Sequence, residues 1–119
     1  MTQVLVIDDH EDIREVFRLA LESAGFDVVA VESWQDAPES MRTEPPDVVV
    51  TDYMMPGMTG HEVCRSLRAS PFTRDVPIIM VSAHGDLVPQ DTVECVDQLL
   101  GKPVTMNELV DAVRARLPR

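Results

Sequence analysis

Five polar side chains stand where short apolar runs of the chain end: Asp8, Asp9, Asp52, Ser82 and Lys102. Three carboxylates brought together repel one another unless a cation relieves them, and hard oxygen donors in a small set favour Mg²⁺. An ammonium group and a hydroxyl beside that cation could hold phosphoryl oxygens during in-line transfer. The remaining role is a nucleophile, which a carboxylate fills by forming an acyl phosphate. We assign that role to Asp52, because a loop rich in proline and glycine follows it.

The apolar runs that precede these side chains have the composition of strands. They are Gln3–Ile7, Asp27–Val31, Asp47–Thr51, Ile78–Val81 and the very short Leu99–Leu100. Apolar runs without alternation are typical of strands that are covered on both faces, as in parallel sheets. Only the second run offers no polar group that could join the other strand ends.

Five helices are expected between and after these strands. Apolar residues at helical spacing predict the first helix from Ile13 to Ala24, with Gly25 closing it. Further helices are expected over Trp34–Arg42, from Thr59 to about Ala69, over Asp86–Gln98, and from Thr105 to Leu117. Thr59 and Thr105 each stand three residues before a glutamate, which is the pattern of a capping box. Proline residues weaken two of these predictions, since Pro38 and Pro89 lie inside the expected segments.

Strands that alternate with helices predict an α/β fold with right-handed crossovers and helices on both faces of one sheet. We expect a single domain over residues 1–119, a doubly wound five-stranded parallel sheet with five helices, of the flavodoxin-like kind. The expected strand order is 2-1-3-4-5, because this order makes the second strand an edge, away from Asp52. Sites in such sheets form at the carboxyl ends of the strands, where the strand order reverses.

The composition excludes several classes of function. The 119 residues carry a net charge of −11, so phosphate backbones repel the domain and nucleic-acid binding by it is not expected. No apolar stretch is long enough to cross a membrane, and no signal peptide precedes the first strand, so we expect a cytoplasmic protein without membrane contact.

Cysteine and histidine residues give no motif of their own. Cys64 and Cys95 form no CxxC pair, and we expect them to be free thiols in a reducing cytoplasm. His10, His61 and His84 are not spaced like metal ligands and are expected at the surface.

The combination of these residues resembles the receiver domain of two-component response regulators, with its chemotaxis-regulator-like fold. The residues that carry the resemblance are Asp8–Asp9, Asp52 within TDYMMPGMTG, Ser82–Ala83 and Lys102–Pro103. Each motif alone is weak, but their order and their positions at strand ends make the combination specific. The likeness extends over nearly the whole chain.

The resemblance implies a role for each site residue. Asp52 would accept a phosphoryl group from the phosphohistidine of a histidine kinase or phosphotransfer protein. Asp9 and Asp52 would ligate Mg²⁺ directly, Asp8 mostly through water, and Met54 through its backbone carbonyl. Ser82 would hydrogen-bond the phosphoryl group, and Lys102 would pair with it. The peptide bond from Lys102 to Pro103 is expected to be cis, which is the minority form of X–Pro bonds, roughly 5%.

The chain departs from the family pattern in the region that follows Ser82. Leu99 occupies the switch position, three residues before the lysine, where the family usually has an aromatic residue. The segment from Ser82 to Lys102 is also slightly shorter than usual, so we expect an altered surface for the downstream protein, whose identity is open. A homodimer through the last helices is a further possibility that the resemblance raises.

Three functions are compatible with these residues. The leading one is a signalling module that is phosphorylated on Asp52 and changes its conformation and partner binding; its chemistry is self-directed, so it is not a turnover enzyme. A Mg²⁺-dependent phosphatase with an aspartyl-phosphate intermediate would generally need an acid where this chain has Met54. A protein-interaction module that is never phosphorylated is compatible with Leu99 but leaves the full set of site residues unexplained.

Overall fold

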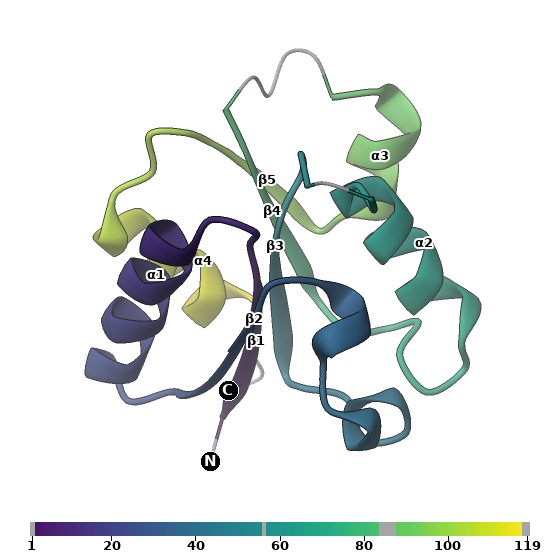
Figure 1. Ribbon diagram of the computed structural model, residues 1–119, viewed down its shortest axis with the longest axis horizontal. Coiled ribbons are helices and arrows are strands. Elements are labelled where there is room, and N and C mark those ends of the chain that lie inside the picture. Colours follow the sequence, from purple (N-terminus) through teal and green to yellow (C-terminus); the bar gives the residue numbers. More distant parts are fainter. Residues whose placement is uncertain (1, 56, 84–87, 118–119) are drawn as a thin grey trace.

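Five apolar strands form a parallel sheet at the centre of the molecule (Figure 1). The computed structural model describes residues 2–55, 57–83 and 88–117. The strands are β1 (Gln3–Ile7), β2 (Asp27–Val31), β3 (Val48–Asp52), β4 (Ile78–Ser82) and β5 (Gln98–Gly101). Their order is β2-β1-β3-β4-β5 and every neighbouring pair is parallel, which confirms the predicted topology.

Helices cover both faces of the sheet. They are α1 (Glu11–Ser23), α2 (Gly60–Ala69), α3 (Gln90–Cys95) and α4 (Met106–Ala115). Helices α1 and α4 lie together on one face, and α2 and α3 lie on the other (Figure 1). This is the doubly wound arrangement that the alternation of strands and helices predicts.

The number of helices was predicted wrongly, since the described residues contain four α-helices instead of five. The segment Trp34–Arg42 forms two 3₁₀ turns, η1 (Trp34–Asp36) and η2 (Glu39–Arg42). Pro38 separates them, and the residue before it, Ala37, is extended with φ −63° and ψ 144°. A proline disfavours the α conformation of the preceding residue and supplies no N–H, so a continuous helix cannot pass through this point.

Helix α3 is much shorter than the predicted segment Asp86–Gln98. It begins directly after Pro89 and ends at Cys95, where Val96 becomes extended. Residues 86 and 87 of the predicted segment lie outside the described residues. A helix of six residues has little stability of its own, so its position depends on contacts with the rest of the fold.

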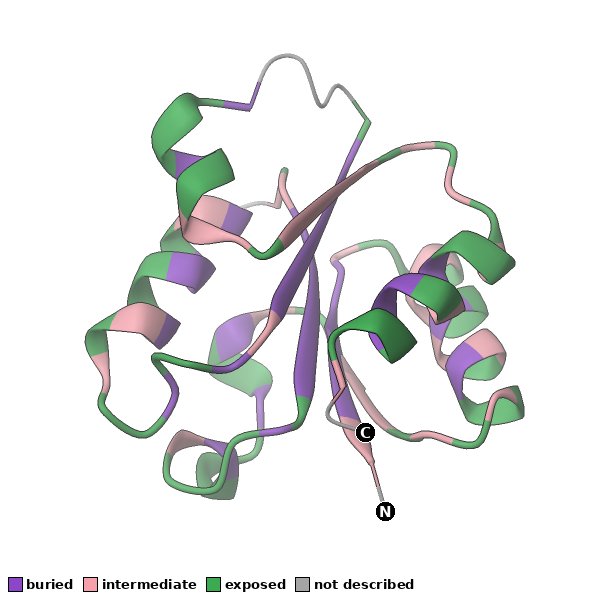
Figure 2. Cartoon of the chain, turned by 180° about the vertical axis from the view of Figure 1, so that it is seen from behind, coloured by how far each residue is buried: buried purple, intermediate pink, exposed green. Residues whose placement is uncertain are grey.

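The strand residues alternate between two hydrophobic clusters. Val4 and Val6 of β1 pack with α1 and α4, whereas Leu5 and Ile7 pack with α2 and the 3₁₀ turns. β3 and β4 are buried along their whole length, and their neighbours cover them on both faces (Figure 2). Burial on both faces explains why these strands are continuously apolar.

Both predicted capping boxes are present. The side chain of Thr59 accepts a hydrogen bond from the backbone N–H of Glu62, and that of Thr105 accepts one from Glu108. Each glutamate carboxylate accepts the backbone N–H of its threonine in return. These bonds satisfy N–H groups that the first turns of α2 and α4 would otherwise leave unpaired.

The prediction of two free thiols is wrong. Cys64 of α2 and Cys95 of α3 form a disulfide, and the described residues contain no free cysteine. The two residues are 31 positions apart and meet only because α2 and α3 pack side by side. None of the helices in the described part of the chain is long and apolar enough to cross a membrane.

Candidate functional site

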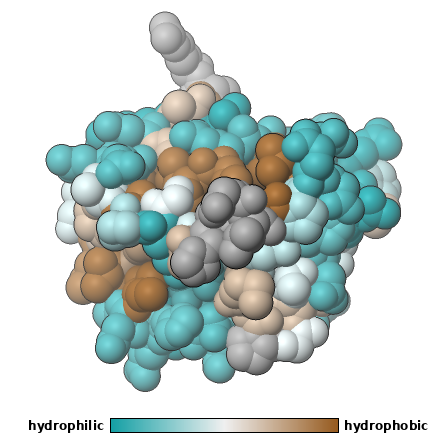
Figure 3. Space-filling view, turned by 90° about the horizontal axis from the view of Figure 1, so that it is seen from above, coloured by the Kyte–Doolittle hydropathy of each residue, from teal (hydrophilic) through white to brown (hydrophobic). Residues whose placement is uncertain are grey.

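The polar side chains at the strand ends converge at one edge of the sheet. Asp8 and Asp9 follow β1, Asp52 and Ser82 are the last residues of β3 and β4, and Lys102 follows β5. Because β1, β3, β4 and β5 are neighbours in this order, their carboxyl ends share one edge. A view onto this end of the molecule shows hydrophilic and hydrophobic surface side by side (Figure 3). The second strand ends in Val31 and is separated from Asp52 by β1, as the strand order requires.

Asp52 lies at the centre of this group and is only 5% exposed. Its Oδ1 atom accepts a hydrogen bond from the backbone N–H of Tyr53 (2.9 Å) and lies 3.3 Å from Nζ of Lys102. Helix α2 begins directly against this residue. A Cβ atom on Gly60 would lie 2.5 Å from the backbone oxygen of Asp52, so only glycine allows the helix to approach so closely.

Burial raises the pKa of Asp52 above its ordinary value, because a carboxylate is poorly solvated in this position. The ammonium group of Lys102 opposes the rise, the negative charge of Asp8 adds to it, and the hydrogen bonds from Lys102 and Tyr53 oppose it. The balance leaves the carboxylate less stable in its charged form than an exposed aspartate. A cation bound beside Asp52 would therefore stabilise the charged form of this carboxylate.

Two carboxylate oxygens beside Asp52 are buried and accept no hydrogen bond in the described structure, Oδ2 of Asp8 and Oδ1 of Asp9, although the second has the ring of His10 nearby. Asp8 is 1% exposed, and its other oxygen accepts the backbone N–H of His10 at 2.8 Å. Buried carboxylate oxygens without partners are costly, and a hard divalent cation satisfies them. The donor set of Asp8, Asp9 and Asp52 therefore fits Mg²⁺.

His10 joins this group, which its sequence spacing did not indicate. One ligand atom from each of Asp8, Asp9, His10 and Asp52 lies within 4.8 Å of the others. The ring Nδ1 of His10 is 3.3 Å from Oδ1 of Asp9. Its side chain is 62% exposed, so the prediction of a surface histidine holds while its position next to the carboxylates was missed. The one indication in the sequence was that His10 follows Asp9 directly.

The other two histidines differ from each other. His61 is partly buried, and its Nδ1 lies 2.8 Å from the hydroxyl oxygen of Thr92, so it belongs to the contact between α2 and α3. The prediction of a surface position holds only in part for this residue, whose side chain is 26% exposed. His84 lies outside the described residues.

A cavity of about 280 Å³ opens beside Asp52. The residues that line it are His10, Asp52, Tyr53, Met54, Ser82, Ala83 and Lys102. Ser82 is buried on the neighbouring strand, and the side chain of Lys102 is 20% exposed. Residues that bear a carboxylate, a hydroxyl and an ammonium group thus line one space at the edge of the sheet.

The remaining predicted residues lie around this space. Met54 is 67% exposed in the loop after β3 and lines the cavity. The peptide bond between Lys102 and Pro103 is cis. Leu99 lies partly buried in β5, paired with Met80 of β4, and does not line the cavity.

The sequence matches the family model described as the response regulator receiver domain over residues 4–114. It is 36% identical over 118 residues to the phosphate regulon transcriptional regulatory protein PhoB of Pseudomonas aeruginosa. It is 39% identical over 121 residues to the DNA-binding response regulator MtrA of Mycobacterium tuberculosis. Each alignment covers 98% of this chain but 52% and 51% of the relative, so the chain spans about half the length of these curated relatives.

Solved structures show the same fold. A CheY-like response regulator receiver domain from Methylobacillus flagellatus superimposes with a TM-score of 0.86 at 28% identity, covering 98% of both chains. The chemotaxis protein CheY4 of Vibrio cholerae superimposes with a TM-score of 0.87 at 26% identity, covering 98% of this chain and 99% of that one. The chain therefore belongs to the response regulator receiver domain family of two-component signalling.

Proposed function

We propose that Asp52 accepts a phosphoryl group from the phosphohistidine of a histidine kinase or phosphotransfer protein, with Mg²⁺ held by the neighbouring carboxylates. The observation that carries the proposal is the surroundings of Asp52. Its buried carboxylate lies 3.3 Å from Nζ of Lys102 and beside the unpartnered oxygen of Asp8.

Asp9 and Asp52 are the proposed direct ligands of Mg²⁺, and Asp8 acts mostly through water. The backbone carbonyl of Met54 is the third ligand that the protein supplies directly. When bound, Mg²⁺ neutralises charge on the carboxylates and on the phosphoryl oxygens. Oδ2 of Asp8, which is buried without a partner, and Oδ1 of Asp9, which is buried and accepts no hydrogen bond, support this assignment.

In the proposed step, a carboxylate oxygen of Asp52 attacks phosphorus and an acyl phosphate forms. The bond between phosphorus and the donor's imidazole nitrogen breaks, and the electron pair remains on that nitrogen. Lys102 stabilises the negative charge of the phosphoryl oxygens, and Ser82 donates a hydrogen bond to one of them. Because the acceptor is the protein itself and the group is later lost to water, the domain is not a turnover enzyme.

The partners follow from the same chemistry. The donor must present a phosphohistidine, and phosphorylation would change the surface offered to a downstream protein, with Leu99 in the switch position. MtrA is named as a DNA-binding regulator, but the chain spans about half of that protein. For the chain itself, the net charge of −11 disfavours contact with DNA.

The test is phosphorylation by a small phosphodonor. The protein is incubated with acetyl phosphate in the presence or absence of Mg²⁺, and the intact mass is recorded over time. We expect a single phosphate adduct that requires Mg²⁺ and is lost in Asp52→Asn. Asp111→Asn removes an exposed carboxylate from α4 and should retain the adduct, so it is the matched control.

Other outcomes distinguish the alternatives. A folded protein that binds Mg²⁺ but gains no mass would favour an interaction module that is never phosphorylated. Continuous release of phosphate from several phosphate monoesters would favour a phosphatase. Either result would overturn the proposal.

A further inference from the structure

The disulfide between Cys64 and Cys95 is the one covalent connection between α2 and α3 in the described chain. The Cα atoms are 6.3 Å apart, a separation that a disulfide spans without movement of the backbone. Cys64 is completely buried, while Cys95, the last residue of α3, is partly exposed. The two sulfur atoms therefore differ in how solvent and reagents can reach them.

The disulfide lies in the middle of a stripe of polar contacts. His61, Cys64 and Arg68 are spaced by three and four residues, so they face the same side of α2. At one end of the stripe His61 contacts Thr92. At the other end Arg68 donates a hydrogen bond to the carbonyl oxygen of Cys95. The covalent bond is thus flanked on both sides by contacts that hold α3 in the same position.

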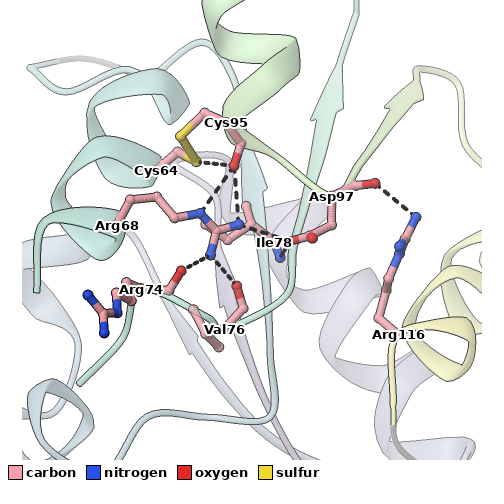
Figure 4. A network of polar contacts seen from close by, with 8 residues as sticks. All are labelled: Cys64, Arg68, Arg74, Val76, Ile78, Cys95, Asp97 and Arg116. Carbon is pink, nitrogen blue, oxygen red and sulfur yellow. Dashed lines mark hydrogen bonds and ion pairs between the residues drawn. A yellow bond between two sulfur atoms is a disulfide. The ribbon is translucent and has the colours of Figure 1, made fainter. Parts of the chain in front are cut away.

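Arg68 is the anchor of this stripe (Figure 4). Its Nε and Nη2 atoms donate to the carbonyl oxygen of Cys95 at 3.2 and 3.1 Å, and Nη2 also contacts Oδ2 of Asp97 at 2.9 Å. Nη1 donates to the carbonyl oxygens of Arg74 and Val76. These contacts involve no sulfur atom, so opening the disulfide removes none of them directly, and reduction need not unfold the region.

Within the described part of the chain, Cys95 is the partly exposed member of the disulfide. A cavity of about 440 Å³ lies beside it and is lined by Arg65, Arg68, Ala69, Asp91, Glu94 and Cys95. Cys95 lines the cavity and Cys64 does not. The lining has two arginines and two carboxylates, so its formal charges balance, and the anionic thiolate that attacks in thiol–disulfide exchange meets no net negative charge there.

The surroundings also suit the reduced state. The Sγ atom of Cys64 lies 3.0 Å from the carbonyl oxygen of Cys95. It has no hydrogen to donate in the disulfide, but the free thiol could donate to this oxygen. The buried sulfur would therefore gain a polar partner when the bond opens.

We infer that Cys64–Cys95 is a reversible thiol–disulfide exchange site that takes a thiol reductant through the cavity at Cys95 and whose oxidation state sets how firmly α3 is held on α2. The incoming thiolate attacks Sγ of Cys95, the disulfide bond breaks, and the electron pair leaves on Sγ of Cys64, which takes a proton. A second thiolate then attacks the sulfur of the bound reductant and releases Cys95, which is protonated in turn. In the net reaction two thiols are oxidised to a disulfide, and the protein gains two electrons and two protons.

The position of the bond makes α3 the element that responds. Helix α3 has six residues, so it depends on tertiary contacts. Helix α2 begins at Gly60 against Asp52, while α3 lies between β4, which ends at Ser82, and β5. The disulfide thus ties the helix next to Asp52 to the helix that follows Ser82 in the chain.

The first test is a redox titration of the full chain in buffers of reduced and oxidised glutathione. Samples are quenched with a thiol-alkylating reagent, and the intact mass gives the fraction with two free thiols. We expect one transition in which both thiols appear together in folded protein. A protein that shows two alkylated thiols under every condition, or a bond that opens only on unfolding, would overturn the proposal.

The second test measures amide hydrogen exchange in the two states. Reduction should accelerate exchange of the amides over residues 90–96 by about tenfold, since a disulfide constrains the open state of the segment it closes. Helix α4 should be unchanged and is the internal control. Cys95→Ser, whose replaced side chain is partly exposed, should show the fast exchange under both conditions. Equal exchange in oxidised and reduced wild-type protein would contradict the role of the bond at α3.

Single-cysteine variants test the direction of attack. Cys64→Ala leaves Cys95, which should react with oxidised glutathione at least about tenfold faster than the Cys64 that remains in Cys95→Ser, because of their difference in exposure. Equal rates in two folded variants would contradict the proposed entry through the cavity. Should Cys64→Ala fail to fold, the site of the mixed disulfide that wild-type protein forms with glutathione is located by peptide mapping. Glutathione on Cys95 would support the same conclusion, and glutathione on Cys64 would reject it.

Discussion

Lys102 Nζ lies 3.3 Å from Oδ1 of Asp52, so a side chain that follows β5 reaches the last residue of β3. The contact passes over the end of β4, the strand between them, which ends in Ser82. Three adjacent strand ends thus supply an ammonium group, a hydroxyl and a carboxylate. The topology of the sheet, and not proximity in sequence, creates this arrangement.

Removal of the Lys102 ammonium group should slow phosphorylation of Asp52. Lys102→Met keeps the length of the side chain but provides no charge for the phosphoryl oxygens, and we expect a rate about 100-fold lower with acetyl phosphate. Initial rates of adduct formation by intact mass provide the measurement. Lys102→Arg keeps the charge and should lose less activity than the methionine variant. Equal rates for wild type and Lys102→Met would show that the ion pair has no part in the transfer.

Asp52→Asn should stabilise the protein at neutral pH in the absence of divalent cations. Since burial raises the pKa of Asp52, the folded state binds a proton more tightly than the unfolded state does. The resulting stability is complete below the ordinary carboxyl pKa and is lost as pH rises through the raised pKa of the folded state. The asparagine variant avoids this loss.

The measurement is the free energy of unfolding by urea at several pH values. The advantage of Asp52→Asn over wild type should be present at pH 7 and should diminish at acidic pH, where wild-type Asp52 is protonated. Asp111→Asn, at an exposed position, should show no comparable dependence on pH. A destabilised Asp52→Asn at pH 7 would indicate that the attraction of Lys102 outweighs burial.

The sequence predicted the sheet well, because the apolar runs of β1, β3 and β4 are buried between two layers of helices and all the strands end at the same edge. Asp8, Asp52 and Ser82 could be placed without coordinates, since strand order alone brings them together. The closeness of Gly60 to Asp52 could not be predicted, because it depends on how α2 packs against the loop after β3.

Two failures have different physical causes. A helix was expected over Trp34–Arg42 although Pro38 lies inside the segment. The proline divides this segment into two 3₁₀ turns. The disulfide between Cys64 and Cys95 is a matter of tertiary packing, since no local pattern in the sequence records that α2 and α3 are neighbours. Sequence patterns predicted the first segment as helical but gave too little weight to the proline. They carry no information on which helices pack against each other.

Gly60→Ala should destabilise the protein and displace α2 from the acceptor site. The added methyl group would lie 2.5 Å from the backbone oxygen of Asp52 and 3.0 Å from Cα of Tyr53, and neither backbone atom can move freely. We expect a loss of about 1–3 kcal/mol in the free energy of unfolding, the usual cost of an overpacked site.

Gly101→Ala is the matched control for this substitution. Gly101 also lies near the site, at the end of β5, but a Cβ atom there would meet nothing within 4 Å. Urea unfolding of both variants should show a large loss for Gly60→Ala and a small change for Gly101→Ala. Similar stabilities would mean that α2 can shift away from β3 at little cost.

Asp8→Asn should weaken Mg²⁺ binding by at least about tenfold, on the scale of changes to groups that support a metal ligand set. The variant removes one negative charge and the oxygen Oδ2, which is buried without a partner, but keeps an acceptor for the backbone N–H of His10. It also removes the charge of Asp8, which adds to the larger effect of burial in raising the pKa of Asp52. Calorimetric titration with Mg²⁺ gives the dissociation constant without any phosphodonor, with Asp111→Asn as the control. An unchanged constant in Asp8→Asn would place the cation away from the unpartnered oxygen and would remove the main structural support for the magnesium site.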